Sequence, residues 1–203
     1  MVRVRRLAHR ERLEFADLLA GLTAEQWTAP TLCAGWSVRD VAAHTVGYLD
    51  QGVARLLKRM LAARGDVDRV NAAIQPTSVA LTPAQLVDLM HRDAAPSGAG
   101  GLYGGRVALI ECLIHQQDIR RPLGLARPIS EDALRVCLTY ARVSPVIATR
   151  RTRGLRLVAT DLDWSAGRGP EVRGAGEALL LAMTGRVDAV REELAGDGLS
   201  RLG

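Results

Sequence analysis

Two residues that could do chemistry share one predicted helix. Glu111 and His115 stand four residues apart within a stretch rich in Leu and Ile. At about 100° per residue, their side chains lie on the same face of a helix, one turn apart. A carboxylate and an imidazole are costly to bury there without partners. A divalent cation would satisfy both, because two ligands from one helix and one from a facing helix can form a site in a bundle core.

His44 is the candidate for the third ligand. It lies in a second apolar helical stretch, and antiparallel packing would bring it opposite Glu111 and His115. Two imidazoles and one carboxylate suit zinc, iron, nickel or manganese, and three protein ligands leave one position open for a reactant. The spacing leaves two alternatives. Cys112 and His115 could face inward together, or Glu111 and His115 could form a hydrogen-bonded pair without a metal.

Composition excludes several classes of protein. The chain has 203 residues, of which 48% are hydrophobic and 24% charged, as in a globular domain with at most a small appendage. No apolar run is long enough to cross a bilayer, and the charged residues that follow the basic start argue against a signal peptide. We therefore expect a cytoplasmic protein that does not bind membranes. Three cysteines without a Cys-x-x-Cys pair predict neither a disulfide framework nor a zinc finger.

The net charge of +5 raises the question of nucleic-acid binding. Five of the arginines fall within the first twelve residues. No aromatic stacking residues or DNA-reading motif accompany them, so we interpret this segment as the solvated face of a first helix. The sequence therefore predicts no nucleic-acid partner.

Start and stop signals outline the elements that must position these residues. Ser37 is a good N-cap with Asp40 three residues later, and Thr82-Pro83 opens a further helix. Helices are expected over 3–20, 38–63, 83–95, 106–121 and 131–148. After residue 153 the pattern predicts strands over 155–160, 171–173 and 199–202, with helices over 175–186 and 188–195. The fold class is mainly α: a four-helix bundle over 1–150 with a small α+β extension over 154–203.

Three segments resemble the mycothiol-dependent maleylpyruvate isomerase family, one of the DinB-like (DinB/YfiT) metal-binding helical bundles. They are WTAPTLCAGWSVRDVAAH at 27–44, ECLIHQQDIRRPLG at 111–124, and the tail at 159–186. The resemblance implies a divalent metal, commonly zinc, held by His44, Glu111 and His115. It implies that Cys112 is a core neighbour, and that Asp118 steadies His115 or a helix end.

The resemblance also implies an activity based on mycothiol, the small thiol of actinobacteria. Its sulfur would take the open metal position, where its pKa falls and a thiolate forms near neutral pH. Addition of the thiolate to an electrophilic double bond, then rotation and elimination, gives cis–trans isomerisation; without elimination the result is S-transfer. No side chain need act as nucleophile, so Cys33 is expected to be a packing residue. The enzyme would be a monomer or a homodimer.

The tail of about 50 residues is shorter than the larger C-terminal domain expected of the full isomerase. This difference keeps two other functions open. One is a non-catalytic regulatory module that binds metal or ligand. The other is a metal-dependent hydrolase with water at the open position, for which Asp118 is the one candidate base.

Overall fold

The computed structural model describes residues 2–49, 51–64, 81–144 and 151–202. The chain divides into two compact units, Met1–Ala126 and Arg127–Gly203. This division lies before the helix expected over 131–148, whereas the sequence predicted a boundary near residue 150. Among the helices of the described ranges, none has both the length and the apolar character needed to cross a membrane.

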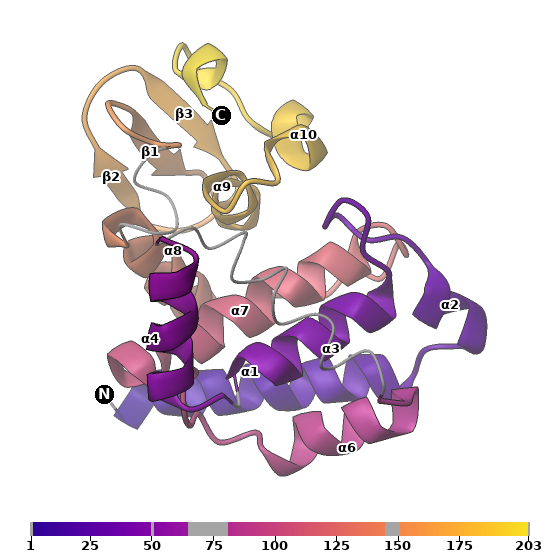
Figure 1. Ribbon diagram of the computed structural model, residues 1–203. Helices are drawn as coiled ribbons and strands as arrows, with labels where there is room; N and C mark the ends of the chain where they lie inside the picture. Colours follow the sequence, from indigo (N-terminus) through magenta and orange to yellow (C-terminus); the bar gives the residue numbers. More distant parts are fainter. Residues whose placement is uncertain (1, 50, 65–80, 145–150, 203) are drawn as a thin grey trace. The chain divides into compact units, whose positions relative to one another are not determined.

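The first unit is built on four helices that contact one another in a closed ring (Figure 1). They are α1 (Val2–Ala20), α3 (Val38–Leu49), α6 (Pro83–Arg92) and α7 (Leu102–Arg120). Both α1 and α3 pack against α6 and α7. The side chains between them are fully buried and mostly apolar: Phe15, Leu19, Leu49, Leu86, Met90, Leu109, Ile110 and Leu113. This arrangement confirms the expected four-helix bundle. Two short helices, α2 (Ala24–Thr28) and α4 (Val53–Ala62), also lie in the described part of this unit.

The start of α3 follows the expected capping pattern. The Ser37 backbone N–H donates to Asp40 Oδ2 at 2.9 Å, and the Asp40 N–H donates to Ser37 Oγ at 3.3 Å. These bonds satisfy backbone donors at the helix end, where the carboxylate also faces the positive end of the helix dipole. The start of α3 in turn decides which face of the helix presents His44.

Replacing Ser37 with alanine removes this cap. We expect a loss of about 1 kcal/mol in the free energy of unfolding, the usual effect of deleting a serine N-cap. Urea denaturation of the two proteins measures the difference. Thr23→Ala, at the exposed capping box of α2, is the matched control for a cap away from the bundle core. Equal stability of the wild type and Ser37→Ala would contradict the role given to this cap.

The single helix expected over 38–63 is wrong. Helix α3 ends at Leu49, and α4 begins at Val53 after an extended Gly52. A distant loop takes the carbonyl groups at the break: the Gly100 N–H donates to Leu49 O at 3.2 Å and the Ala99 N–H donates to Gln51 O at 2.9 Å. The helix stops because its last acceptors bond to another segment.

Helix α7 becomes regular at Arg106, the residue at which the sequence predicted a helix start. Tyr103, Gly104 and Gly105 before it have positive φ angles of 51°, 72° and 91°. The two glycines allow this left-handed stretch, since they lack a Cβ. The regular part then runs to Arg120 and includes Leu109–Asp118. It carries two of the candidate metal ligands, Glu111 and His115.

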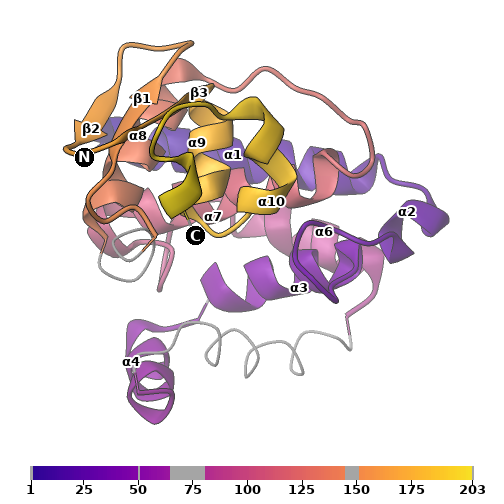
Figure 2. The same cartoon turned by 90° about the horizontal axis from the view of Figure 1, so that it is seen from above.

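The second unit packs helices on a small sheet. Its sheet has the order β2-β1-β3, with β1 antiparallel to β2 and parallel to β3. Leu157 and Val172 point to the buried side, where α9 packs on β1 and β3 (Figure 2). The elements are α8 (Glu131–Val143), β1 (Arg156–Ala159), β2 (Ser165–Gly167), β3 (Glu171–Gly174), α9 (Gly176–Met183), α10 (Val187–Val190) and the 3-10 helices η1 (Arg191–Glu193) and η2 (Leu199–Arg201).

Most expectations for this unit hold, with three differences. The strands at 155–160 and 171–173 and the helix at 175–186 are confirmed as β1, β3 and α9, with shorter bounds. The strand expected over 199–202 is wrong, because these residues form η2. The helix expected over 188–195 is split into α10 and η1, and β2 was not predicted. Helix α8 ends at Val143; residues 145–148 of the predicted helix lie outside the described residues.

Candidate metal centre

Three predicted side chains converge between α3 and α7. His44 comes from α3, and Glu111 and His115 come from successive turns of α7. His115 Nε2 lies 3.3 Å from Glu111 Oε2, and His44 Nε2 lies 3.9 Å from the same oxygen. Both imidazoles are buried, whereas the Glu111 side chain keeps 19% of its exposure. Among the three side chains, the Glu111 carboxylate is therefore the most exposed to solvent.

The spacing of these atoms fits a divalent cation. Zinc bonds of about 2.0–2.1 Å in a tetrahedron place neighbouring ligand atoms about 3.3–3.4 Å apart. The 3.3 Å and 3.9 Å separations lie close to this distance. Two imidazoles and a carboxylate are also ligands that zinc takes in sites with an open position. All three ligand atoms of His44, Glu111 and His115 lie within 4.8 Å of one another.

The second nitrogen of His115 faces Asp118. Nδ1 lies 2.8 Å from Asp118 Oδ2, and the Asp118 side chain has no exposed surface. An ionised carboxylate can only accept a hydrogen bond, so Nδ1 is the donor. This contact turns Nε2 toward Glu111. Such a carboxylate behind a metal-binding histidine fixes the tautomer and the orientation of the ring.

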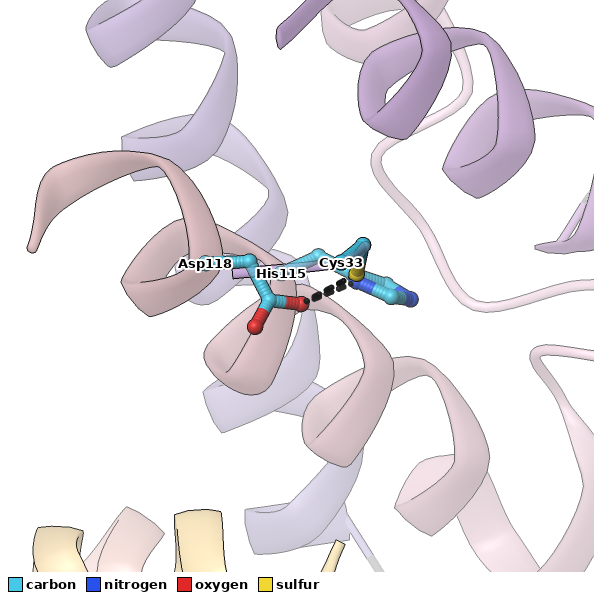
Figure 3. A group of neighbouring side chains, drawn as sticks. All are labelled: Cys33, His115 and Asp118. Atoms are coloured by element: carbon cyan, nitrogen blue, oxygen red, sulfur yellow. Dashed lines mark hydrogen bonds and ion pairs between the residues drawn. The ribbon is translucent and has the colours of Figure 1, made fainter. Parts of the chain in front are cut away.

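Cys33 contacts the same Asp118 oxygen, as Figure 3 shows. Its Sγ lies 3.1 Å from Oδ2, so the thiol and the imidazole both bond to one atom. Cys33, His115 and Asp118 also form a possible ligand group by proximity. However, 2.8 Å and 3.1 Å are hydrogen-bond distances, shorter than the separations around a tetrahedral zinc. This second group is a hydrogen-bonded set behind His115.

The sequence analysis missed the role of Cys33 in this set, since it treated the residue as packing. Cys33 and Asp118 are separated by 85 residues, and no local spacing relates them. The sequence also left open a pair of inward-facing ligands, Cys112 and His115. Cys112 is buried in α7. Among the described residues, neither possible ligand group includes it.

Two aromatic rings flank His44. The Trp36 ring lies 5.0 Å from the His44 ring in an edge arrangement, and Tyr48 stacks on it at 5.7 Å. They hold the imidazole from two sides and define its plane. The sequence analysis assigned neither to the site, although Tyr48 follows His44 by four residues, the spacing of neighbours on one helix face.

Burial and hydrogen bonding act in opposite directions on the two ionisable groups of α7. Burial opposes ionisation of Glu111, but hydrogen bonds from His115 and His44 outweigh it and lower the Glu111 pKa to about 2. Burial likewise opposes protonation of His115. Its hydrogen bonds to Asp118, Cys33 and Glu111 outweigh that effect and hold the His115 pKa well above the usual value. In the absence of a cation, the carboxylates of Asp118 and Glu111 therefore favour the protonated form of His115.

Known proteins resemble this chain in sequence motif and in fold. Residues 8–99 match the family described as the mycothiol maleylpyruvate isomerase N-terminal domain. A crystal structure of the mycothiol-dependent maleylpyruvate isomerase has the same fold, with a TM-score of 0.61 and 14% identity, and so does a mutant of that enzyme, with a TM-score of 0.59 and 14% identity. Each match covers 96% of this chain and 92% of the isomerase chain. The search of curated proteins found no match.

The coverage corrects one expectation. The sequence analysis expected the full isomerase to have a larger C-terminal domain than this chain. Because the matches cover 92% of the isomerase chain, that expectation is wrong. The family match ends at residue 99, so it includes Cys33 and His44 but not the two candidate ligands of α7. Residues 8–99 are therefore similar to the mycothiol maleylpyruvate isomerase N-terminal domain family, in agreement with the motif found at 27–44.

Proposed function

We propose that the protein binds a divalent cation, with zinc as the expected ion, and catalyses a mycothiol-dependent isomerisation or S-transfer. The observation that carries the proposal is the convergence of His44, Glu111 and His115 at ligand spacing. His44 Nε2, Glu111 Oε2 and His115 Nε2 would hold the ion. When bound, it would lower the pKa of a thiol beside it, so that a thiolate forms near neutral pH.

The residues of the site suit an anionic reactant. Glu111 contributes one negative charge, and the two imidazoles bind a cation in their neutral forms. A divalent ion and its three ligands would therefore carry a net positive charge at the open position where a thiolate would bind, while the negative charge of Asp118 lies behind His115. The partial exposure of Glu111 leaves an approach for the thiolate. Asp118 would hold His115 in place, and Trp36 and Tyr48 would do the same for His44.

The chemistry assigned to the bound thiolate is addition to an electrophilic double bond. As the C–S bond forms, the π electrons move onto the electron-withdrawing group of the substrate, and the former double bond becomes a single bond that can rotate. Return of this electron pair with elimination of the thiolate then restores the double bond in the other configuration. If the adduct instead takes a proton from solvent and is released, the product carries the thiol and the reaction is an S-transfer. Maleylpyruvate, named in the solved isomerase, is the first electrophile to test.

The test is a titration of mycothiol into the zinc-loaded and the metal-free protein, followed by calorimetry, after elemental analysis of the purified chain. We expect one equivalent of metal, and thiol binding that disappears when the metal is removed. Turnover of maleylpyruvate, or of another electrophile, should then require the thiol. Metal binding without thiol binding would overturn the proposed activity and leave a binding module.

One contact argues against a hydrolase. That reaction needs a base beside the open position, and Asp118 was the candidate. Its Oδ2 already accepts from His115 and lies against Cys33, and the side chain is fully buried. It faces the Nδ1 side of His115, whereas the ligand atom of that ring is Nε2. Asp118 is therefore placed to hold the ring and not to activate water.

A further inference from the structure

We infer that Cys33 is a positioning residue of this centre: its thiol donates to Asp118 and so helps to fix the orientation of His115. The inference rests on the proposed metal site and adds a residue to it. Sγ lies 3.1 Å from Asp118 Oδ2, the oxygen that also accepts from His115 Nδ1 at 2.8 Å (Figure 3).

The loop around Cys33 holds the residue by its backbone. The Cys33 N–H donates to Thr31 Oγ1 at 3.1 Å, and the Thr31 hydroxyl donates to Trp36 O at 2.9 Å. The Trp36 N–H donates back to Cys33 O at 2.9 Å. A bridge between Pro30 and Ser37 closes the loop. These backbone contacts hold the turn in place independently of the contact between the Cys33 thiol and Asp118.

The same loop is attached to α7 at Asp118 through the main chain. The Leu32 N–H donates to the Asp118 carbonyl oxygen at 3.0 Å. Asp118 thus meets the loop with its backbone through Leu32 and with its side chain through Cys33. The loop is therefore fixed against α7 at Asp118, the residue that orients His115.

The loop also reaches the other histidine. Trp36 contacts the His44 ring, and Ser37 caps the helix that carries His44. Residues 30–37 thus act on both histidine ligands, on one through Trp36 and on the other through Cys33 and Asp118. This placement explains why a cysteine 85 residues distant in sequence from Asp118 belongs to the metal centre.

The role requires a hydrogen-bond donor on the side chain of residue 33, because an ionised carboxylate only accepts hydrogen bonds. The thiol gives Asp118 Oδ2 a second donor beside His115 Nδ1 and lowers the penalty of burying the carboxylate. Serine can supply a donor at this position, whereas alanine cannot.

The experiment compares Cys33→Ala and Cys33→Ser with the wild type, and uses Cys112→Ala as a matched control for the loss of a buried cysteine. Zinc affinity is measured by competition with a chelator. We expect Cys33→Ala to bind about tenfold more weakly, the lower end of the effect of residues behind a metal ligand. Cys33→Ser and Cys112→Ala should stay within about threefold of the wild type. Circular dichroism checks that each variant folds.

A second measurement uses the metal-free protein. The ¹H and ¹⁵N resonances of the His115 Nδ1–H group report its hydrogen bond to Asp118. We expect Cys33→Ala to shift them, Cys33→Ser to return them toward the wild-type position, and Cys112→Ala to leave them in place. If Cys33 had only a packing role, Cys33→Ala would change the stability of the protein without selectively shifting the His115 Nδ1–H resonances.

The two measurements separate the failure of the inference from the failure of the proposed function. Wild-type protein that binds no zinc would overturn the proposed function, while the Nδ1 resonances would still test the link from Cys33 to His115. Unchanged resonances in Cys33→Ala would overturn the inference, and so would unchanged zinc affinity beside a wild type that binds zinc. In an Asp118→Asn background, we expect Cys33→Ala to have no further effect on zinc affinity, since contacting residues are not additive.

Discussion

Purified variants with alanine at His44, Glu111 or His115 are expected to contain no stoichiometric metal. Each substitution removes one of three side chains whose ligand atoms converge, and two ligands do not hold a divalent ion against a chelator. The loss of metal affinity should exceed the loss of about 10- to 100-fold that follows substitution of a residue hydrogen-bonded to a metal ligand. Elemental analysis and competition with a chelator measure it. Thiol-dependent turnover should be lost in the same variants.

Controls separate the loss of a ligand from the loss of the fold. Glu111→Gln keeps the shape of the side chain and removes its charge, so it should fold and bind metal far more weakly. Cys112→Ala changes the neighbouring buried residue of α7 and should retain one equivalent of metal. The opposite pattern, with metal lost in Cys112→Ala and retained in Glu111→Ala, would show that the ligand set is wrong.

Part of the convergence of the three side chains could be predicted from local signals, and the family resemblance carried the assignment of His44 as the third ligand. Glu111 and His115 share a helix face through their spacing, and the cap at Ser37 sets the start of the helix that carries His44. The bundle then follows from apolar helices that bury their faces against one another.

The features that were missed depend on contacts between distant segments. The break between α3 and α4 arises because Ala99 and Gly100 donate to carbonyl groups at the end of α3. Cys33 reaches Asp118 only because its loop docks on α7. The partner of β3 near the C-terminus is Ala195, one residue before Gly196, whose φ of 114° turns the chain. The segment expected to be a strand is η2.

The affinity for zinc should rise about tenfold for each pH unit while metal-free His115 holds its proton. The ligand atom is Nε2, and an imidazolium has no lone pair there. Because the His115 pKa is held well above its usual value, the metal-free protein carries this proton at neutral pH and must release it on binding. Between pH 6 and pH 8 the affinity should therefore rise by up to about 100-fold. Calorimetry in buffers of different ionisation enthalpy measures the released proton.

Thermal unfolding gives an independent check of the same linkage. The raised pKa of His115 stabilises the metal-free fold below the unfolded value near 6.5, and this contribution is lost as the pH rises through the folded pKa. Glu111, with a pKa of about 2, stabilises the fold above its unfolded value near 4.5 and stays ionised throughout pH 6 to 8. The stabilisation by zinc should consequently grow with pH over this range, because it depends on the dissociation constant for zinc and binding strengthens as the pH rises. A zinc-induced shift in Tm that stays constant from pH 6 to pH 8, together with no proton release at pH 7, would mean that metal-free His115 does not carry the proton assigned to it.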